Sequence, residues 1–131
     1  MEGGGGTIRQ AILEMYKGMP RAQVVENNWE SWSAFLDSVG SMDLMIQPSY
    51  TEGFNMVVAD GVSRGVATAL GDAIAWAPDN WKASTDSASD LANKAVGLLG
   101  DPGAVHEGIE ALIDHNEDAL DKWKKFLTLH P

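Results

Sequence analysis

The sequence predicts an α/β domain built on a parallel sheet and ending in a long helix. Segments with apolar residues at helical spacing alternate with short, nearly continuous apolar runs. Such runs are typical of strands buried on both faces of a parallel sheet. The last segment, to about Leu127, keeps helical periodicity throughout. A length of 131 residues favours one domain that spans residues 1–131.

The N-terminal part is expected to contain a helix, a strand and the start of a second helix. Residues 1–6 include a run of glycines and are expected to form a flexible leader. Thr7 is a candidate N-cap for a helix that ends at residues 18–20, where Gly and Pro occur. Residues 22–26 are predicted to form a short strand, and Ser31 is expected to begin the second helix.

The central part predicts a strand, a loop and a third helix. Residues 43–47 form a nearly continuous apolar run that Pro48 stops. A loop over residues 49–53 follows, and Gly65 is expected to end the helix after it. Residues 66–70 predict a weaker strand. The buried stripe of this helix is predicted to consist of Phe54, Val57, Val58, Gly61 and Val62.

The C-terminal part predicts an irregular stretch and two helices. Residues 71–86 show no clear period, and Ser87 or Ser89 is expected to begin a helix that ends near Leu99. After a turn at residues 100–103, one apolar stripe is predicted for the last helix: Val105, Ile109, Leu112, Leu120, Trp123 and Leu127. Asn116 interrupts this stripe, which indicates a kink or a break, or alternatively a solvated surface position.

The composition limits the classes of function. A formal net charge of −10 argues against a nucleic-acid platform, which needs clustered basic residues. No apolar run is long enough for a membrane span, and no signal peptide is expected. The lack of cysteine excludes disulfides and thiolate metal sites and favours a cytoplasmic protein. The histidines show no metal-ligand spacing, so we interpret them as surface residues and expect no metal site.

The loop after Gln47 is the first candidate site, because parallel sheets bind ligands beyond the carboxyl ends of their strands. Gly53 lets a ligand approach the backbone closely. The free backbone amides around Phe54, Asn55 and Met56, together with the helix dipole, are suited to a diphosphate.

Two carboxylates flank these amides. Glu52 lies at the rim of the loop, and Asp60 lies four residues after Met56 on the same helix face. Carboxylates accept hydrogen bonds from hydroxyl groups, so the order carboxylate, amides, carboxylate matches the sugar, diphosphate and ribose of a nucleotide sugar. The alternatives are two solvated surface carboxylates and a glycine that serves only a turn.

Residues 43–66 as a whole resemble the signature of family-four retaining glycosyltransferases of the GT-B class: a strand, Pro-Ser, Glu-Gly-Phe, and a helix with a second carboxylate. The resemblance implies the C-terminal, three-layer Rossmann-like domain of such an enzyme. It implies that Glu52 binds donor-sugar hydroxyls, that residues 53–56 hold the diphosphate, and that Asp60 binds ribose. The donor would be a UDP- or GDP-sugar, with no metal or other cofactor.

Departures from the family pattern bear on whether the chain catalyses transfer or only binds the donor. Asp60 stands where the family has Glu, and its shorter side chain weakens the expected ribose contact. The family's opening strand and its Arg–Lys diphosphate clamp are not recognisable before Thr7, so the chain reads as N-terminally truncated. We therefore expect donor binding, with transfer requiring a partner or the missing N-terminal half. The expected partners are a nucleotide sugar and a homo-oligomer or completing chain. The alternative is a non-catalytic interaction protein that retains the fold.

Overall fold

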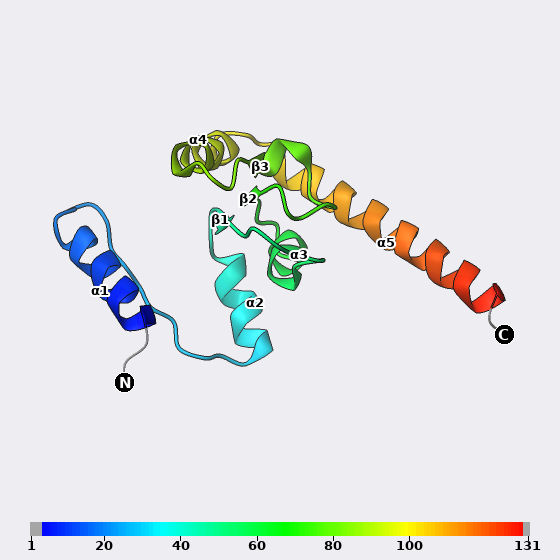
Figure 1. Ribbon diagram of the computed structural model, residues 1–131, viewed down its shortest axis with the longest axis horizontal. Helices are drawn as coiled ribbons and strands as arrows, with labels where there is room; N and C mark the ends of the chain where they lie inside the picture. The colour runs from blue at the N-terminus through cyan, green and yellow to red at the C-terminus, as the bar shows by residue number, and fades with distance from the viewer. Residues whose placement is uncertain (1–3, 130–131) are drawn as a thin grey trace. The chain divides into compact units, whose positions relative to one another are not determined.

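The computed structural model describes residues 4–129 and divides the chain into two compact units, residues 1–30 and residues 31–131. Length alone favoured one domain; the two units are described separately below. The labels are those of Figure 1.

The first unit contains one helix, α1 (Gly4–Lys17). It begins three residues before Thr7, so the described part of the expected leader is helical, and residues 1–3 lie outside the described residues. The strand expected over residues 22–26 is wrong, because that segment has no regular structure. A strand needs a neighbouring strand for its backbone groups, and none is described in this unit. Glu26 instead accepts hydrogen bonds from Arg9, at 2.5 Å from Nε and 2.6 Å from Nη2.

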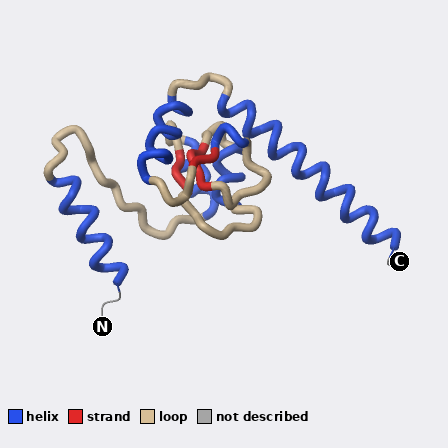
Figure 2. The backbone as a smooth tube through the Cα atoms, turned by 45° about the horizontal axis from the view of Figure 1, so that its top comes forward, coloured by secondary structure: helices blue, strands red, loops and turns tan. Residues whose placement is uncertain are grey.

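The second unit has a sheet of three parallel strands in the order β1-β2-β3, which bears out the predicted α/β class with a parallel sheet. Figure 2 shows the short strands at the centre of this unit with helices around them. Its elements are α2 (Trp32–Gly40), β1 (Met45–Gln47), α3 (Met56–Ser63), β2 (Thr68–Gly71), a 3-10 turn η1 (Asp79–Trp81), β3 (Lys82–Ala83), α4 (Ala88–Leu99) and α5 (Ala104–Leu129).

Local signals place most helix ends correctly. Ser31 caps α2 by accepting from the Ala34 amide at 3.2 Å, and Ser87 caps α4 in the same way through the Asp90 amide at 3.2 Å. Gly65 ends α3 with a φ of 76°, a left-handed conformation that glycine adopts without strain. The helix α3 itself begins at Met56, two residues later than expected. Strand β3 lies within the stretch that was expected to be irregular.

Trp81 joins the long helix α5 to the core. The indole is fully buried, and its Nε1 donates to the Ala104 carbonyl at 3.1 Å. A Cβ on Gly108 would clash with this ring, so the glycine permits the close approach. Helix α5 runs without a break past Asn116, which is exposed, and extends beyond the sheet (Figure 1). The expected break is therefore wrong, and the alternative of a solvated position is correct.

The single apolar stripe predicted for α5 is in fact two faces. Val105 and Leu112 pack against the core, whereas the other members of the predicted stripe are exposed: Ile109, Leu120, Trp123 and Leu127. The two faces are adjacent on the helix, so periodicity alone merged them.

Candidate functional site

The loops that follow the three strands meet at the carboxyl edge of the sheet. Thr85 donates from Oγ1 to Asp72 Oδ1 at 3.1 Å, which links the loops after β2 and β3. Tyr50 donates from its hydroxyl to Asp86 Oδ1 at 3.0 Å, which links the loops after β1 and β3. A Cβ on Gly71 would clash with the Thr85 hydroxyl and lie 3.1 Å from the carbonyl oxygen of Ser49. Glycine at this position therefore lets the three loops converge.

The hydrogen bond between Tyr50 and Asp86 has an electrostatic consequence. Because the hydroxyl donates to a carboxylate, and because ionising it would place two negative charges together, the pKa of Tyr50 is raised above its ordinary value. Tyr50 therefore stays a neutral hydrogen-bond donor at the edge of the loop that leads to α3.

Asn55 turns the chain from this loop into α3. Its φ of 59° and ψ of 90° lie in a region that most side chains avoid and that asparagine tolerates. Its Oδ1 accepts a hydrogen bond from the Val58 amide at 3.1 Å, which is a side-chain N-cap. Among the first helical amides, those of Met56 and Val57 have no intrahelical acceptor by helix geometry. The amides of Met56, which the sequence predicted, and of Val57, one residue further along, are thus available to an anion.

The backbone around Gly53 is open. A Cβ built on Gly53 would meet no described atom within 4 Å, and its φ is not in the left-handed region. Neither packing within the described protein nor backbone strain explains glycine at this position. The open space would let another molecule approach this backbone closely, as it would at Gly97, where a Cβ also meets no described atom within 4 Å.

The two carboxylates of the predicted site are both half-buried. Glu52 precedes Gly53 in the loop, and Asp60 lies one helical turn after Met56 on α3. Within residues 4–129, the carboxylate oxygens of these two residues take part in no hydrogen bond or ion pair, although the Asp60 carbonyl accepts from Ser63 Oγ at 2.7 Å. Both carboxylates can therefore accept from ligand hydroxyls. Residues 48–60 contain no Lys or Arg. A ligand's charge would therefore be met here by backbone amides rather than by a basic clamp.

An aromatic cluster that the sequence did not predict lies beside this entrance and consists of Phe54, Trp76 and His115. The Phe54 ring stacks on His115, with ring centroids 5.1 Å apart and an interplanar angle of 21°. Trp76 lies 5.5 Å from Phe54 and donates from its Nε1 to the Phe54 carbonyl at 2.5 Å. The cluster thus ties the loop before α3 to the β2–β3 connection and to α5.

Only a weak sequence signal points to this cluster. His115 was expected to be a surface residue, but it lies on the face of α5 that Ala104 and Gly108 turn toward the core. The usable signal was that His115 is spaced from Ala104 and Gly108 so that all three residues lie on one face of a helix. Trp76 lies outside any helix or strand, so no period could place it.

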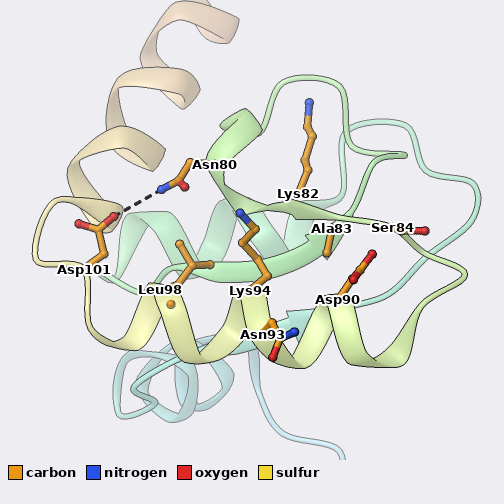
Figure 3. A pocket seen from close by; sticks show the side chains of 10 residues that line it. Asn80, Lys82, Ala83, Ser84, Asp90, Asn93, Lys94, Leu98 and Asp101 are labelled. Carbon is orange, nitrogen blue, oxygen red and sulfur yellow. Dashed lines mark hydrogen bonds between the residues drawn. The ribbon is translucent and has the colours of Figure 1, made fainter.

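A hollow lies between β3 and α4 and shares no residue with the predicted site. Its volume is about 520 Å³, and Figure 3 shows its lining residues. Lys94 has no ion-pair partner among residues 4–129, whereas Lys82 is bound to Asp79 at 3.1 Å. Asn80 donates to Asp101 at 3.4 Å across one end. The lining mixes both charges, so it does not by itself select a class of ligand.

Two further properties of the described residues bear on function. Within residues 4–129, no three His, Asp or Glu side chains come together as a metal would require. None of the helices described is both long enough and apolar enough to cross a bilayer.

Comparison with known proteins gave no match, whether by family model, by curated protein or by solved structure. The functional argument therefore depends on the geometry of the chain itself.

Proposed function

We propose that the entrance to α3 binds the diphosphate of a nucleotide sugar, as the donor-binding part of a retaining glycosyltransferase. The open backbone at Gly53, directly before the helical amides of Met56 and Val57, is the observation that supports the proposal most. A phosphate at that place would accept from amides that have no intrahelical acceptor and would lie at the positive end of the helix dipole.

Side chains around the entrance favour a nucleotide sugar over inorganic phosphate. Glu52 and Asp60 flank the amides in sequence and would accept hydrogen bonds from hydroxyl groups rather than bind phosphate. The partly exposed Phe54 ring offers an apolar face on which a sugar or a base can pack. A ligand with hydroxyl groups on both sides of its phosphates uses all of these features.

The fold assignment that accompanies this proposal is a Rossmann-like domain corresponding to part of a GT-B C-terminal domain. Its support is the parallel sheet, with the candidate site beyond the carboxyl end of β1. The lack of cysteine fits a reducing compartment, so the proposal places the chain in the cytoplasm.

The proposed activity of the isolated chain is binding rather than transfer. Transfer requires charge stabilisation on the leaving diphosphate and an oriented acceptor. The amides of α3 can contribute to the first requirement. Acceptor orientation would come from a completing chain or from a longer parent protein.

The test is a titration of UDP- and GDP-sugars into isotope-labelled protein, followed by amide chemical shifts. We expect saturable shifts at residues 52–60, with a smaller response to free phosphate. No shift in this segment at millimolar donor would reject the proposal. The variant Glu52→Gln should lose the preference for UDP-sugar over UDP, whereas Glu107→Gln, a half-buried control on α5, should keep it.

A non-catalytic interaction protein is the second candidate. The large apolar side chains that α5 exposes favour it, because such surfaces invite association. A stable dimer whose melting temperature does not respond to any nucleotide sugar would support this candidate over the first.

A further inference from the structure

From Ile109 onward, α5 carries an exposed apolar stripe that the proposed donor site does not use. Its apolar members are between 39% and 62% exposed, although they are large side chains. They continue past the part of the helix that packs on Trp81. We call this surface the outer stripe of α5; it consists of Ile109, Ile113, Leu120, Trp123 and Leu127, with Asn116 in line.

The outer stripe has the spacing of a coiled-coil seam. Successive members are separated alternately by four and three residues, from Ile109 through Asn116 to Leu127. This is the heptad pattern, in which the first and fourth positions face a partner helix. One polar residue at a first position is a known device for fixing register, and Asn116 is a polar residue at a fourth position of this seam. The spacing therefore indicates a helical partner rather than a flat or irregular one.

The charges along α5 identify the partner. Residues 104–121 contain no Lys or Arg and carry Glu107, Glu110, Asp114, Glu117, Asp118 and Asp121. Residues 122–125 carry Lys122, Lys124 and Lys125. Lys122 is paired with Asp118 at 2.7 Å on its own helix, and the other two lysines follow directly. The helix thus has an acidic segment and a basic end. The charge of the basic end on one copy is complementary to that of the acidic segment on another copy.

We propose that α5 pairs with α5 of a second copy of this chain as an antiparallel coiled coil. Antiparallel pairing brings the basic end of each helix against the acidic segment of the other, whereas parallel pairing opposes like charges. This dimer goes beyond the proposed donor site, and its test requires no nucleotide sugar.

One register satisfies the apolar pattern and brings opposite charges together toward the ends of the paired segment. In antiparallel pairs, the first position of a heptad on one helix faces the fourth position on the other. A register centred on Asp118 meets this condition along the stripe and pairs Ile109 with Leu127, Ile113 with Trp123, and Asn116 with Leu120. The same register brings Glu110 near Lys124 of the second copy. It also brings the two copies of Glu117 together near the symmetry axis.

The first test is the mass of the full chain in solution, measured by sedimentation over a range of concentrations. We expect a reversible dimer. Leu120→Asp and Trp123→Asp would each bury a charge in the seam and should raise the dissociation constant at least about tenfold. Val96→Asp is the matched control, because Val96 is an apolar residue of α4 that is 70% exposed. Circular dichroism of each variant distinguishes lost association from lost folding.

Orientation is tested with single cysteines, since the chain has none. A short bis-maleimide linker should join Glu117→Cys chains, because the two positions meet at the axis. Leu127→Cys chains should not be linked. In the proposed register these two positions lie roughly 27 Å apart, at about 1.5 Å of rise per residue. A parallel pair would instead allow linking at position 127, because each residue then lies level with its own copy.

Three outcomes would overturn the proposal. A chain that stays monomeric at all concentrations would show that the partner of the outer stripe is not a second copy of this chain. A dimer that neither Asp variant weakens would place the interface on another surface. Linking through position 127 in preference to position 117 would exclude the antiparallel pair. None of these results bears on donor binding, so the two proposals fail separately.

Discussion

Gly108 and Gly53 look alike in the sequence, but the structure surrounds them in opposite ways. At Gly108 the Trp81 ring fills the space that a side chain would need, so α5 can approach the core. At Gly53 the corresponding space is empty of described atoms. The first glycine therefore serves the fold, whereas the backbone at the second is open to a molecule outside the chain. Stability measurements on variants of the two regions test this difference.

The largest effect is expected for Trp81→Ala, which removes the side chain that joins α5 to the core. Trp81 is fully buried and also bonds the Ala104 carbonyl. Truncation of such a residue costs about 3–5 kcal/mol of unfolding free energy. Urea denaturation followed by far-ultraviolet circular dichroism measures the loss. A change below about 1 kcal/mol would mean that α5 does not depend on this contact.

Gly108→Ala should destabilise less, but in the same way. The added methyl group would collide with the Trp81 ring, and overpacking of this kind costs about 1–3 kcal/mol. The control is Gly97→Ala in α4, where a Cβ meets no described atom within 4 Å. That control should gain roughly 0.5–1 kcal/mol, because alanine favours helix. Equal effects in the two variants would contradict the close packing at Gly108.

Asn55→Ala should cost the α3 entrance about 1–2 kcal/mol, because the variant loses the N-cap to Val58. The side chain of alanine also disfavours the positive φ of 59°. Asn55→Gly should recover most of this loss, since glycine adopts that φ freely. Thermal unfolding of the two variants gives the comparison. If both are equally unstable, the cap rather than the backbone conformation dominates.

Sequence patterns predicted this molecule well where the signal was local. Ser31, Ser87 and Gly65 act through atoms within a few residues, so their types alone placed helix ends. Residues 22–26 failed because a strand requires a distant partner that composition does not reveal. Strand β3 was missed for the related reason that two residues are too few to show a period.

The candidate site shows the same division between local and distant information. The sequence placed a glycine-containing loop before α3, and the structure has one. It did not predict that Asn55 would cap the helix through its own side chain, or that the helix would begin at Met56. In the aromatic cluster, Phe54 contacts Trp76 and His115, which follow it in the chain by 22 and 61 positions, respectively. Such contacts depend on tertiary packing, which short patterns do not encode.

A smaller effect, dependent on pH, is expected at the loop that leads to α3. The pKa of Tyr50 is raised by its bond to Asp86, so the bond's contribution is fully present below the ordinary pKa of tyrosine. It is lost as pH rises through the higher pKa of the folded state. Phenolate absorbance in a Tyr16→Phe background, which leaves Tyr50 as the only tyrosine, measures this pKa. Asp86→Asn should return it toward its ordinary value, and no change would mean that the two loops are not linked.

Gly53→Ala is expected to have the smallest effect on folding and the most informative effect on binding. Since nothing described occupies the space and φ is not left-handed, the unfolding free energy should change by no more than about 1 kcal/mol, in the stabilising direction. If a diphosphate approaches this backbone, the same methyl group should weaken donor binding, as measured by the amide titration of residues 52–60. A variant as unstable as Gly108→Ala would show that the two glycines serve the fold alike. A stable variant that binds donor normally would show that the ligand does not approach the backbone at Gly53. The open backbone before α3 would then need another explanation.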